Sequence, residues 1–456
     1  MKKRSNLISE NSEEELKRIL RKVIRRIRVC FASDLKNDQV PLSPYTVFES
    51  EKQGLRYHQQ KRPARWRWAY DSLLEADPCW KKDLDDFVVQ MRRNSSVRNE
   101  IKSADEDHVK RALAYACIRL HADGSEIEIG KLTEAFRSFF IDGQETHRLY
   151  IPVRGVEMHQ EKLRGRLGPW RLIRPTESQR VQIANAFTQE SPFDNYQSTA
   201  WQSLLWFQKD LYLKSTNMAV AGVHRDTDQT IPMLRVLFGA NTVFVGPVTE
   251  VVGLSWTACA MGGIDISSGR MQIFGSSDRS KSFLTTNEYL RPASDLFSSY
   301  QKHESTQLQR AVKRLQTACS RKDAGDWLSD LCTALDTLFL EKNEQGSAKV
   351  KRRASRLLDR GEKAKSVEGQ FRQLYKLRNE KVHEDVDHGA DVRAQLREFS
   401  ELVRRSIAAF INLSRVKKID NENIEIIELA LLGDLTCEKL LDRVQKQAVV
   451  RERPNL

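Results

Sequence analysis

Apolar residues recur every three or four positions through most of the chain after Pro292, which is the period of an amphipathic helix. The clearest repeats predict four helices, at residues 311–317, 327–340, 349–360 and 392–413. The segment between the last two adds a helical face of Leu374, Leu377 and Val382. We therefore expect residues 303–456 to form a C-terminal α-helical bundle, with a further amphipathic helical stretch at residues 424–444.

The pattern changes between about Gly155 and Pro292, where glycines separate short β-branched runs. Runs of this kind predict strands and hairpins at residues 236–238, 242–245 and 248–252. Residues 151–292 are therefore expected to form a β-rich or mixed middle domain.

The N-terminal region, residues 1–150, is expected to be mostly helical and basic. A capping box at residues 12–15 precedes an apolar stripe at 16–31, whose other positions are mainly Lys and Arg. This pattern fits a helix on phosphates or on an anionic membrane surface, and equally a helix docked by its apolar face. Further helical patterns occur at residues 82–93, 108–121 and 131–140.

Cations alternate with aromatic rings at residues 56–70. Such a run is typical of a surface that stacks unpaired bases, but its later rings also have the spacing of a helix that faces a core. With 456 residues, the chain is too long for one ordinary core. The expected fold class is therefore α+β, with several domains.

The composition narrows the class of protein. The chain has 75 Lys and Arg against 62 Asp and Glu, a net charge of +13 that favours a polyanionic partner such as nucleic acid. Its seven cysteines are scattered, which disfavours a zinc site or a disulfide framework and fits a reducing compartment. No apolar run is long enough to cross a membrane. We therefore expect a cytoplasmic protein that needs no metal or other cofactor.

A polar cluster interrupts one of the predicted helices of the bundle. At about 100° per residue, Tyr375, Asn379 and His383 form a single stripe, while Arg378 points about 140° away from His383. An imidazole moves protons near neutral pH and a guanidinium stabilises a developing anion. The Asn379 amide is placed to hold the His383 ring. Arg378, Asn379 and His383 are therefore the candidate catalytic residues, with Tyr375 and Glu384 in support.

The spacing of Arg378, Asn379 and His383 resembles the motif of the HEPN superfamily of helical domains, which is Arg, a small polar residue, three residues and His. The flanking residues at 311–338 and 374–378 resemble the Apea-like HEPN family, although that family often has Ser and Gly at the positions of Asn379 and Glu384. The resemblance covers roughly residues 305–415. It implies a metal-independent ribonuclease that acts as a toxin or as an antiviral, abortive-infection type of defence effector.

The expected mechanism uses the RNA 2′-hydroxyl as the nucleophile, so that neither a metal nor a Ser or Cys nucleophile is required. His383 would move the proton, and Arg378 would stabilise the phosphorane oxygens. Two other interpretations stay open. One is a non-catalytic RNA-binding or protein-interaction module on the same scaffold, and the other is a structural role in which Arg378 pairs with a nearby carboxylate.

A basic run just before the motif is the expected RNA-binding surface. Its candidate residues are Lys349, Lys351, Arg352, Arg353, Arg356 and Arg360. Because one copy supplies one Arg and one His, while cleavage uses both a base and an acid, two-fold pairing into a homodimer is expected. The N-terminal half is expected to bind a sensor ligand or a phage component.

Overall fold

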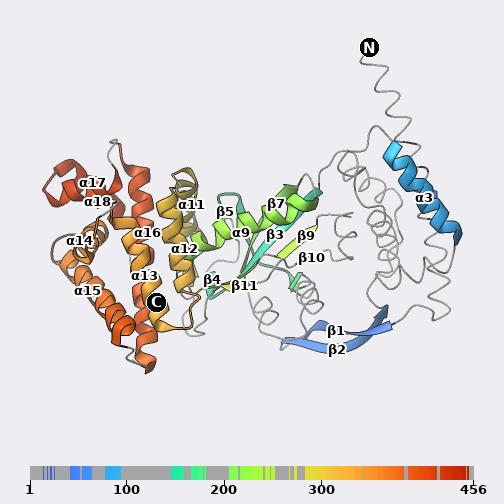
Figure 1. The fold of residues 1–456 in the computed structure, drawn as a ribbon, viewed down its shortest axis with the longest axis horizontal. Helices are drawn as coiled ribbons and strands as arrows, with labels where there is room; N and C mark the ends of the chain where they lie inside the picture. Colours follow the sequence, from blue (N-terminus) through green and yellow to red (C-terminus); the bar gives the residue numbers. More distant parts are fainter. Residues whose placement is uncertain are drawn as a thin grey trace, which may run out of the picture.

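The structure is a computed structural model (Figure 1). It describes residues 14, 18, 21–22, 25, 42–51, 54–63, 78–93, 145–158, 166–177, 179–180, 205–213, 216–239, 242–246, 248–251, 266–267, 272–274, 283–303, 305–341, 344–384, 389–418, 422–447 and 449–450. The described chain is mostly helical, with a small antiparallel sheet in its middle, so the α+β layout is confirmed at this level. The helices predicted at residues 108–121 and 131–140 lie outside the described residues.

The described part of the N-terminal region contains a hairpin as well as a helix. β1 (Leu42–Glu51) pairs antiparallel with β2 (Gly54–Pro63) along its whole length, with Phe48 opposite Tyr57. α3 (Pro78–Arg93) confirms the helix predicted at its position. The hairpin departs from the mostly helical expectation, because aromatic residues at opposite positions of two strands favour strand pairing. The run of cations and rings therefore begins on a strand.

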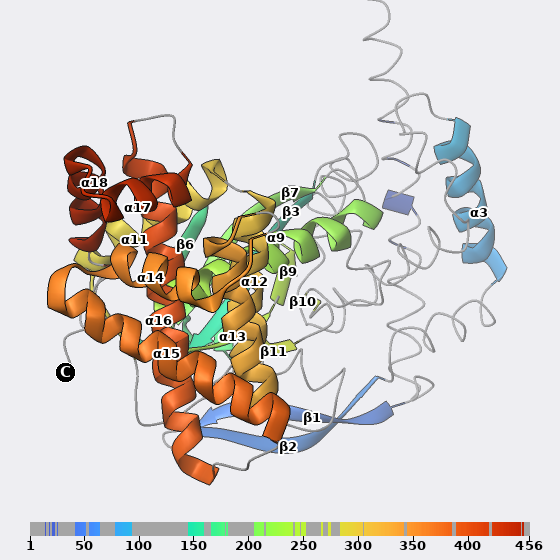
Figure 2. The same cartoon turned by 60° about the vertical axis from the view of Figure 1, so that its left-hand side comes forward.

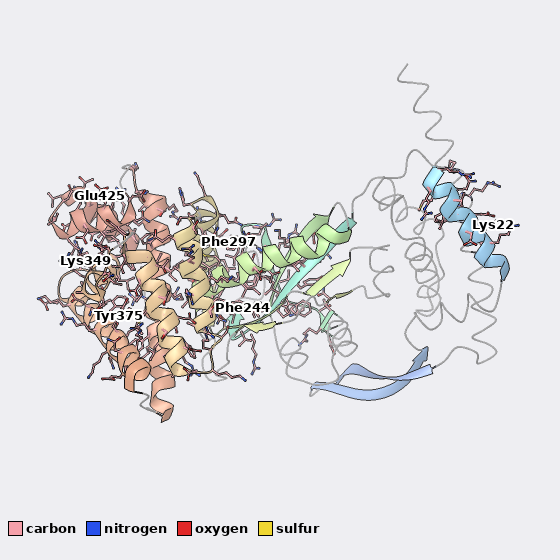
Figure 3. The ribbon with its side chains drawn as sticks, viewed as in Figure 1. Lys22, Phe244, Phe297, Lys349, Tyr375 and Glu425 are labelled. Atoms are coloured by element: carbon pink, nitrogen blue, oxygen red, sulfur yellow. The ribbon has the colours of Figure 1, made fainter. Side chains whose placement is uncertain are left out.

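Five residues of the predicted basic helix near the N-terminus are described. They are helical and exposed: Glu14, Arg18, Arg21, Lys22 and Arg25 (Figure 3 labels Lys22). The apolar stripe that would dock this helix lies outside the described residues. What the helix binds stays a prediction.

The middle sheet is built around β3 (Glu145–Arg154), which pairs antiparallel with β7 (Leu205–Leu213) along nearly all of its length. The other strands of this sheet are β5 (Arg166–Leu167), β6 (Trp170–Ile173), β8 (Val243–Gly246), β9 (Val248–Val251), β10 (Ile266–Ser267) and β11 (Gln272–Phe274). β8 and β9 confirm two of the predicted strands. β3 crosses the boundary predicted between residues 150 and 151, so the middle unit begins at or before Glu145.

A separate parallel pair joins β4 (Val156–Met158) to β12 (Phe283–Thr285). The pair brings the strand after β3 next to the segment that leads into the C-terminal helices.

The strand predicted at residues 236–238 was wrong, because these residues form the last turn of α9 (Thr216–Phe238). Every residue from Ile231 to Phe238 is buried. A helix segment that is buried on all sides has no polar face, so a short β-branched run within it cannot be told from a strand by its periodicity.

Eight helices of the described chain follow β12 and account for the stretches predicted to be helical. They are α11 (Asn287–Lys302), α12 (Thr306–Ala318), α13 (Ala324–Phe339), α14 (Ser347–Leu358), α15 (Gly361–Glu384), α16 (Gly389–Val416), α17 (Asn423–Leu431) and α18 (Leu435–Gln445). Side-chain oxygens of Thr286, Ser305, Asp323 and Asp434 cap four of their N-termini. The stretch predicted at residues 424–444 is two helices, divided at Gly433, whose φ of 92° suits glycine.

The sheet and the bundle share one hydrophobic core. Its buried residues run from Leu149 on β3 through α9 and α11 to Val450. α9 contacts β7, α12 and α16, and α11 contacts β5 and α16. Figure 2 shows α9 passing from the sheet toward these helices. The helical bundle is therefore packed directly against the middle sheet.

Two buried arginines fix the C-terminal end of α9 to the bundle. Arg404 on α16 donates from Nη1 to the Val236 carbonyl at 2.8 Å and to the Val449 carbonyl at 3.1 Å. Arg235 on α9 donates from Nε to Gln316 Oε1 at 3.2 Å, and burial lowers the pKa of its guanidinium. Because these donors are satisfied by acceptors of other elements, a shift of α9 would break hydrogen bonds in the core.

Candidate functional site

α15 carries the whole Arg-to-His motif. Its inner face buries Val367, Phe371 and Leu374, which pack the helix against α13 and α14. Arg378 and His383 therefore lie on one continuous helix, as their spacing predicts. The side chains of His383 and Glu384 are outside the described residues, so the expected contact between Asn379 and the His383 ring stays a prediction.

The Arg378 side chain is half-buried, and its neighbour on the helix holds it. Nη1 of Arg378 donates to Asn379 Oδ1 at 3.0 Å, so the amide oxygen of Asn379 is engaged by the guanidinium. Nε of Arg378 is buried and has no hydrogen-bond partner among the described residues. A buried donor without a partner costs roughly 1–3 kcal/mol. An unpaired buried donor therefore needs an explanation, and one explanation is that the guanidinium binds a ligand.

A carboxylate on the facing helix lies close to this guanidinium. Tyr375, which is 8% exposed, donates from its hydroxyl to Asp336 Oδ1 at 2.5 Å. Burial raises the pKa of Asp336, while the hydrogen bond from Tyr375 and the positive charge of Arg378 lower it. Burial and the Asp336 charge raise the pKa of the Tyr375 phenol far above its usual value. Tyr375 is therefore a fixed hydrogen-bond donor and keeps its proton at neutral pH.

Asp336 is a residue of the site that the sequence alone did not single out. The signal that could have found it is its place on α13, one turn from the buried residues Cys332 and Phe339 on the same helix face. A carboxylate on such a face needs a partner. That partner, Tyr375, is 39 residues further along the chain.

Cys332 lies one turn before Asp336 and is also buried. Burial, followed by the negative charge of Asp336, raises the pKa of its thiol to about 12. The thiol therefore stays protonated at neutral pH, and a thiolate nucleophile at this position is disfavoured.

The basic run on α14 makes contacts within the chain. Arg353 has 5% of its side chain exposed and donates from Nη1 to Glu344 at 2.5 Å and to the Phe339 carbonyl at 2.6 Å. Its Nε donates to Glu428 on α17 at 2.5 Å. These contacts give Arg353 a structural role, because its donors face acceptors inside the fold.

Four other cations of the run also face carboxylates. Lys349 pairs with Glu344 at 2.5 Å, Arg352 with Glu428 at 3.4 Å, Arg356 with Glu438 at 2.7 Å and Arg360 with Asp442 at 2.9 Å. Glu428, Glu438 and Asp442 belong to α17 and α18, which pack beside α14 (Figure 3). The run therefore joins helices as well as presenting positive charge.

Arg353 and Arg356, whose side chains are 5% and 12% exposed, could contact RNA only if α17 and α18 moved away from α14. The two helices bury Ile426, Ile427, Leu441 and Val444 completely. Exposing one side chain of this size costs about 1.5–3 kcal/mol, so the sum for four is comparable to the whole stability of an ordinary domain. The two helices should therefore stay in place when RNA binds.

Lys351 differs from the rest of the run. Its Nζ lies 5.7 Å from the centroid of the Tyr375 ring, which places it beside the motif helix instead of beside α17 and α18. Of the six cations predicted to bind RNA, Lys351 is the one that the described contacts bring next to a residue of the candidate site, the supporting residue Tyr375.

No family model, curated protein or solved structure matches the chain. None of the described helices is long and apolar enough to cross a membrane. Among the described residues, His, Cys, Asp and Glu also form no group that could hold a metal ion. The interpretation of the site therefore rests on its own residues and their geometry.

Proposed function

We propose that the chain is a metal-independent endoribonuclease of the HEPN type, with Arg378 and His383 as its catalytic pair. The observation that carries the proposal is the state of Arg378, which Asn379 fixes at 3.0 Å while its buried Nε has no partner among the described residues. A guanidinium held in this way keeps donors for a phosphate. It is also oriented in advance, which is what transition-state stabilisation requires.

The proposed reaction breaks the P–O5′ bond of RNA. A base removes the proton of the 2′-hydroxyl, O2′ attacks phosphorus, and an acid gives a proton to the leaving 5′-oxygen, so that the products are a 2′,3′-cyclic phosphate and a 5′-hydroxyl. His383 is placed in the proton-transfer role, because an unperturbed imidazole titrates near pH 6.5. Arg378 stabilises the charge on the phosphorane oxygens.

The second proton-transfer group comes from a second copy of the chain in this proposal. A homodimer with two-fold symmetry would place two copies of the motif in one cleft. Light scattering should then give twice the chain mass of 52.6 kDa. An active monomer would remove this part of the proposal.

The biological role that we propose is that of a toxin or antiviral defence effector in the cytoplasm, triggered through the N-terminal half. The alternative is an RNA-binding module without catalysis. The contact of Lys351 with the Tyr375 ring supports an RNA surface under both functions.

One experiment separates the two functions. Purified chain is incubated in excess EDTA with an RNA oligonucleotide and with a matched oligonucleotide whose scissile nucleotide is 2′-deoxy. We expect cleavage of the first with a 2′,3′-cyclic phosphate end, and no cleavage of the second. Binding without any cleavage would support the module, and cleavage of the 2′-deoxy substrate would exclude the 2′-hydroxyl mechanism.

Lys351→Ala is expected to weaken RNA binding and to flatten its salt dependence. One lost phosphate contact on single-stranded RNA should reduce the slope of log Kd against log salt by about 0.7. The matched control is Arg360→Ala on the same run, because Arg360 faces Asp442 at 2.9 Å and lies beside α18. Equal slopes for both variants and the parent, in a filter-binding titration, would show that Lys351 does not contact RNA.

A further inference from the structure

The solvent-exposed face of α12 carries positive charge and no negative charge. Residues 305–322, which include α12 and the turn after it, contain five Lys and Arg and no Asp or Glu. The apolar face of the helix is buried in the core, so the charged face points to solvent. All five cations are exposed: Arg310, Lys313, Arg314, Arg321 and Lys322.

The cations of α12 differ from those of α14 in their partners. Five of the six cations on α14 face carboxylates. On α12, Arg310, Lys313 and Lys322 make no ion pair with any described residue. With the three Asp that follow α12 included, residues 305–330 carry five positive and three negative charges, a net charge of +2. Within the described chain, α12 therefore presents more unpaired cations than the run on α14.

The other two cations of α12 are held side by side by one buried carboxylate. Arg314 Nη1 lies 2.6 Å from Asp330 Oδ1, and Arg321 Nε lies 3.0 Å from Asp330 Oδ2. Asp330 has 5% of its side chain exposed, but the two arginines have 48% and 41%. Arg321 Nη1 also lies 3.6 Å from Asp326, while Nη2 of each arginine makes no hydrogen bond with a described residue. Both guanidiniums are therefore oriented, and each keeps donors for a phosphate.

α13 links this surface to the candidate catalytic site, because it packs against both α12 and α15 (Figure 1). Tyr375 on α15 contacts Asp336, and the charge of Arg378 acts on Cys332, one turn nearer the N-terminus of α13. α15 therefore runs antiparallel to α13. The helical rise then brings His383 level with the N-terminal half of α13, where the arginine pair lies.

Neutral residues of α13 lie between the two sites. Ser329 and Thr333 are half-exposed. Helical periodicity places them between the face that meets α12 at Asp330 and the face that meets α15 at Asp336. A strand bound at the candidate site can therefore continue over these residues to the basic face of α12.

We propose that the basic face of α12 binds the RNA strand that the candidate site cleaves, with Arg314 and Arg321 at one phosphate. Arg310, Lys313 and Lys322 would contact neighbouring phosphates, since a groove of cations that follows the backbone is typical of single-strand binding. The 13 residues of α12 extend about 20 Å, which is long enough for several phosphates. The choice of RNA as the partner rests on the proposed ribonuclease function, but binding and cleavage are measured separately.

The first test is a filter-binding titration of the full chain at several salt concentrations. The probe is a single-stranded RNA with methylated 2′-hydroxyls, which is bound without being cut. The double variant Arg310→Gln with Lys313→Gln removes two exposed cations and leaves the arginine pair in place. It should bind more weakly, and the slope of log Kd against log salt should fall by about 1.4, at about 0.7 for each lost contact.

The matched control is Arg443→Gln with Lys446→Gln at the end of α18. It also removes an exposed Arg and an exposed Lys three residues apart, and neither makes an ion pair with a described residue. The control should keep the slope of the parent. An unchanged slope in the α12 variant, an equal fall in the control, or a parent that does not bind RNA would overturn the proposal.

Asp330→Asn tests whether the arginine pair acts by its geometry. The substitution keeps Arg314 and Arg321 and removes the negative charge that orients them. If charge alone decided binding, this variant would bind RNA more tightly than the parent. We expect weaker binding, with thermal unfolding to show that the variant is folded. Equal or tighter binding would exclude the oriented pair, and if the variant does not fold, the double variant on α12 still decides the proposal.

Single-turnover cleavage of unmodified RNA separates this surface from the proposed catalysis. In Arg310→Gln with Lys313→Gln, the RNA concentration for half-maximal rate should rise by a larger factor than the maximal rate falls. A parent that binds RNA and never cuts it would contradict the ribonuclease, while the salt slopes would still test α12. A parent that cuts RNA, with the same half-saturation in the α12 variant, would contradict the α12 surface alone.

Discussion

Replacing Arg378 or His383 with alanine is expected to lower the rate of RNA cleavage by a factor on the order of 10² to 10⁴. His383→Ala removes the proposed proton-transfer group, and Arg378→Ala removes the guanidinium that Asn379 fixes at 3.0 Å. The measurement is single-turnover cleavage of a labelled oligonucleotide in EDTA. Parent-like cleavage by both variants would place the active site elsewhere.

The matched control for Arg378→Ala is Arg372→Ala. Arg372 lies on the same helix, has 70% of its side chain exposed and pairs with Glu368 at 2.8 Å. Its loss removes one positive charge from α15 without touching the site, so the cleavage rate should stay close to that of the parent. A comparable loss of activity in this control would show that net charge, and not the held guanidinium, determines the rate.

Arg378→Lys separates charge from geometry. An ammonium keeps the positive charge beside Asp336 but loses the planar fork. If Arg378 acts by oriented hydrogen bonds, Arg378→Lys should cleave RNA nearly as slowly as Arg378→Ala. Because it keeps the positive charge, it should still bind RNA more tightly than Arg378→Ala does. Stability should fall by less than for a core truncation of about 2–5 kcal/mol, which thermal unfolding checks.

Arg353→Ala is expected to destabilise the fold by about 3 kcal/mol in urea unfolding. The substitution leaves Glu344 and Glu428 without their shared guanidinium and the Phe339 carbonyl without its donor. The matched control is Arg352→Ala, because Arg352 is 56% exposed and lies 3.4 Å from the same Glu428. Surface pairs of that kind contribute about 0–1 kcal/mol. Equal stability losses in the two variants would contradict the structural role of Arg353.

The pH dependence of stability gives a second test of the contacts that Arg353 makes with Glu344. Hydrogen bonds from Arg353 and Lys349 lower the pKa of Glu344 from 4.5 to about 2. Because the pKa of Glu344 is lower in the folded chain than in the unfolded chain, its ionised carboxylate stabilises the fold at pH values above about 4.5. This contribution to stability is lost as the pH falls from about 4.5 to about 2. In Arg353→Ala the pKa of Glu344 should rise, so the loss of stability over this range should be smaller than in the parent.

Much of the C-terminal secondary structure was predictable from the sequence alone. Helical periodicity located α12, α13, α14 and α16, because each buries one face against its neighbours and so requires apolar residues at regular intervals. The same local logic placed Arg378 and His383 on one helix. It failed for residues 236–238, where burial on all sides of α9 removed the polar face that marks a helix.

The partners of the charged side chains were decided by the tertiary structure. The basic run on α14 has the pattern of a solvated phosphate-binding face, but α17 and α18 bring carboxylates to it from 75 to 82 residues further along the chain. In the same way, Asp336 meets Tyr375 because α13 packs against α15. Periodicity determines which face of a helix is apolar, since that depends on neighbours in sequence. Which opposite charge meets a given Arg depends on how the helices pack, and only the folded chain specifies that.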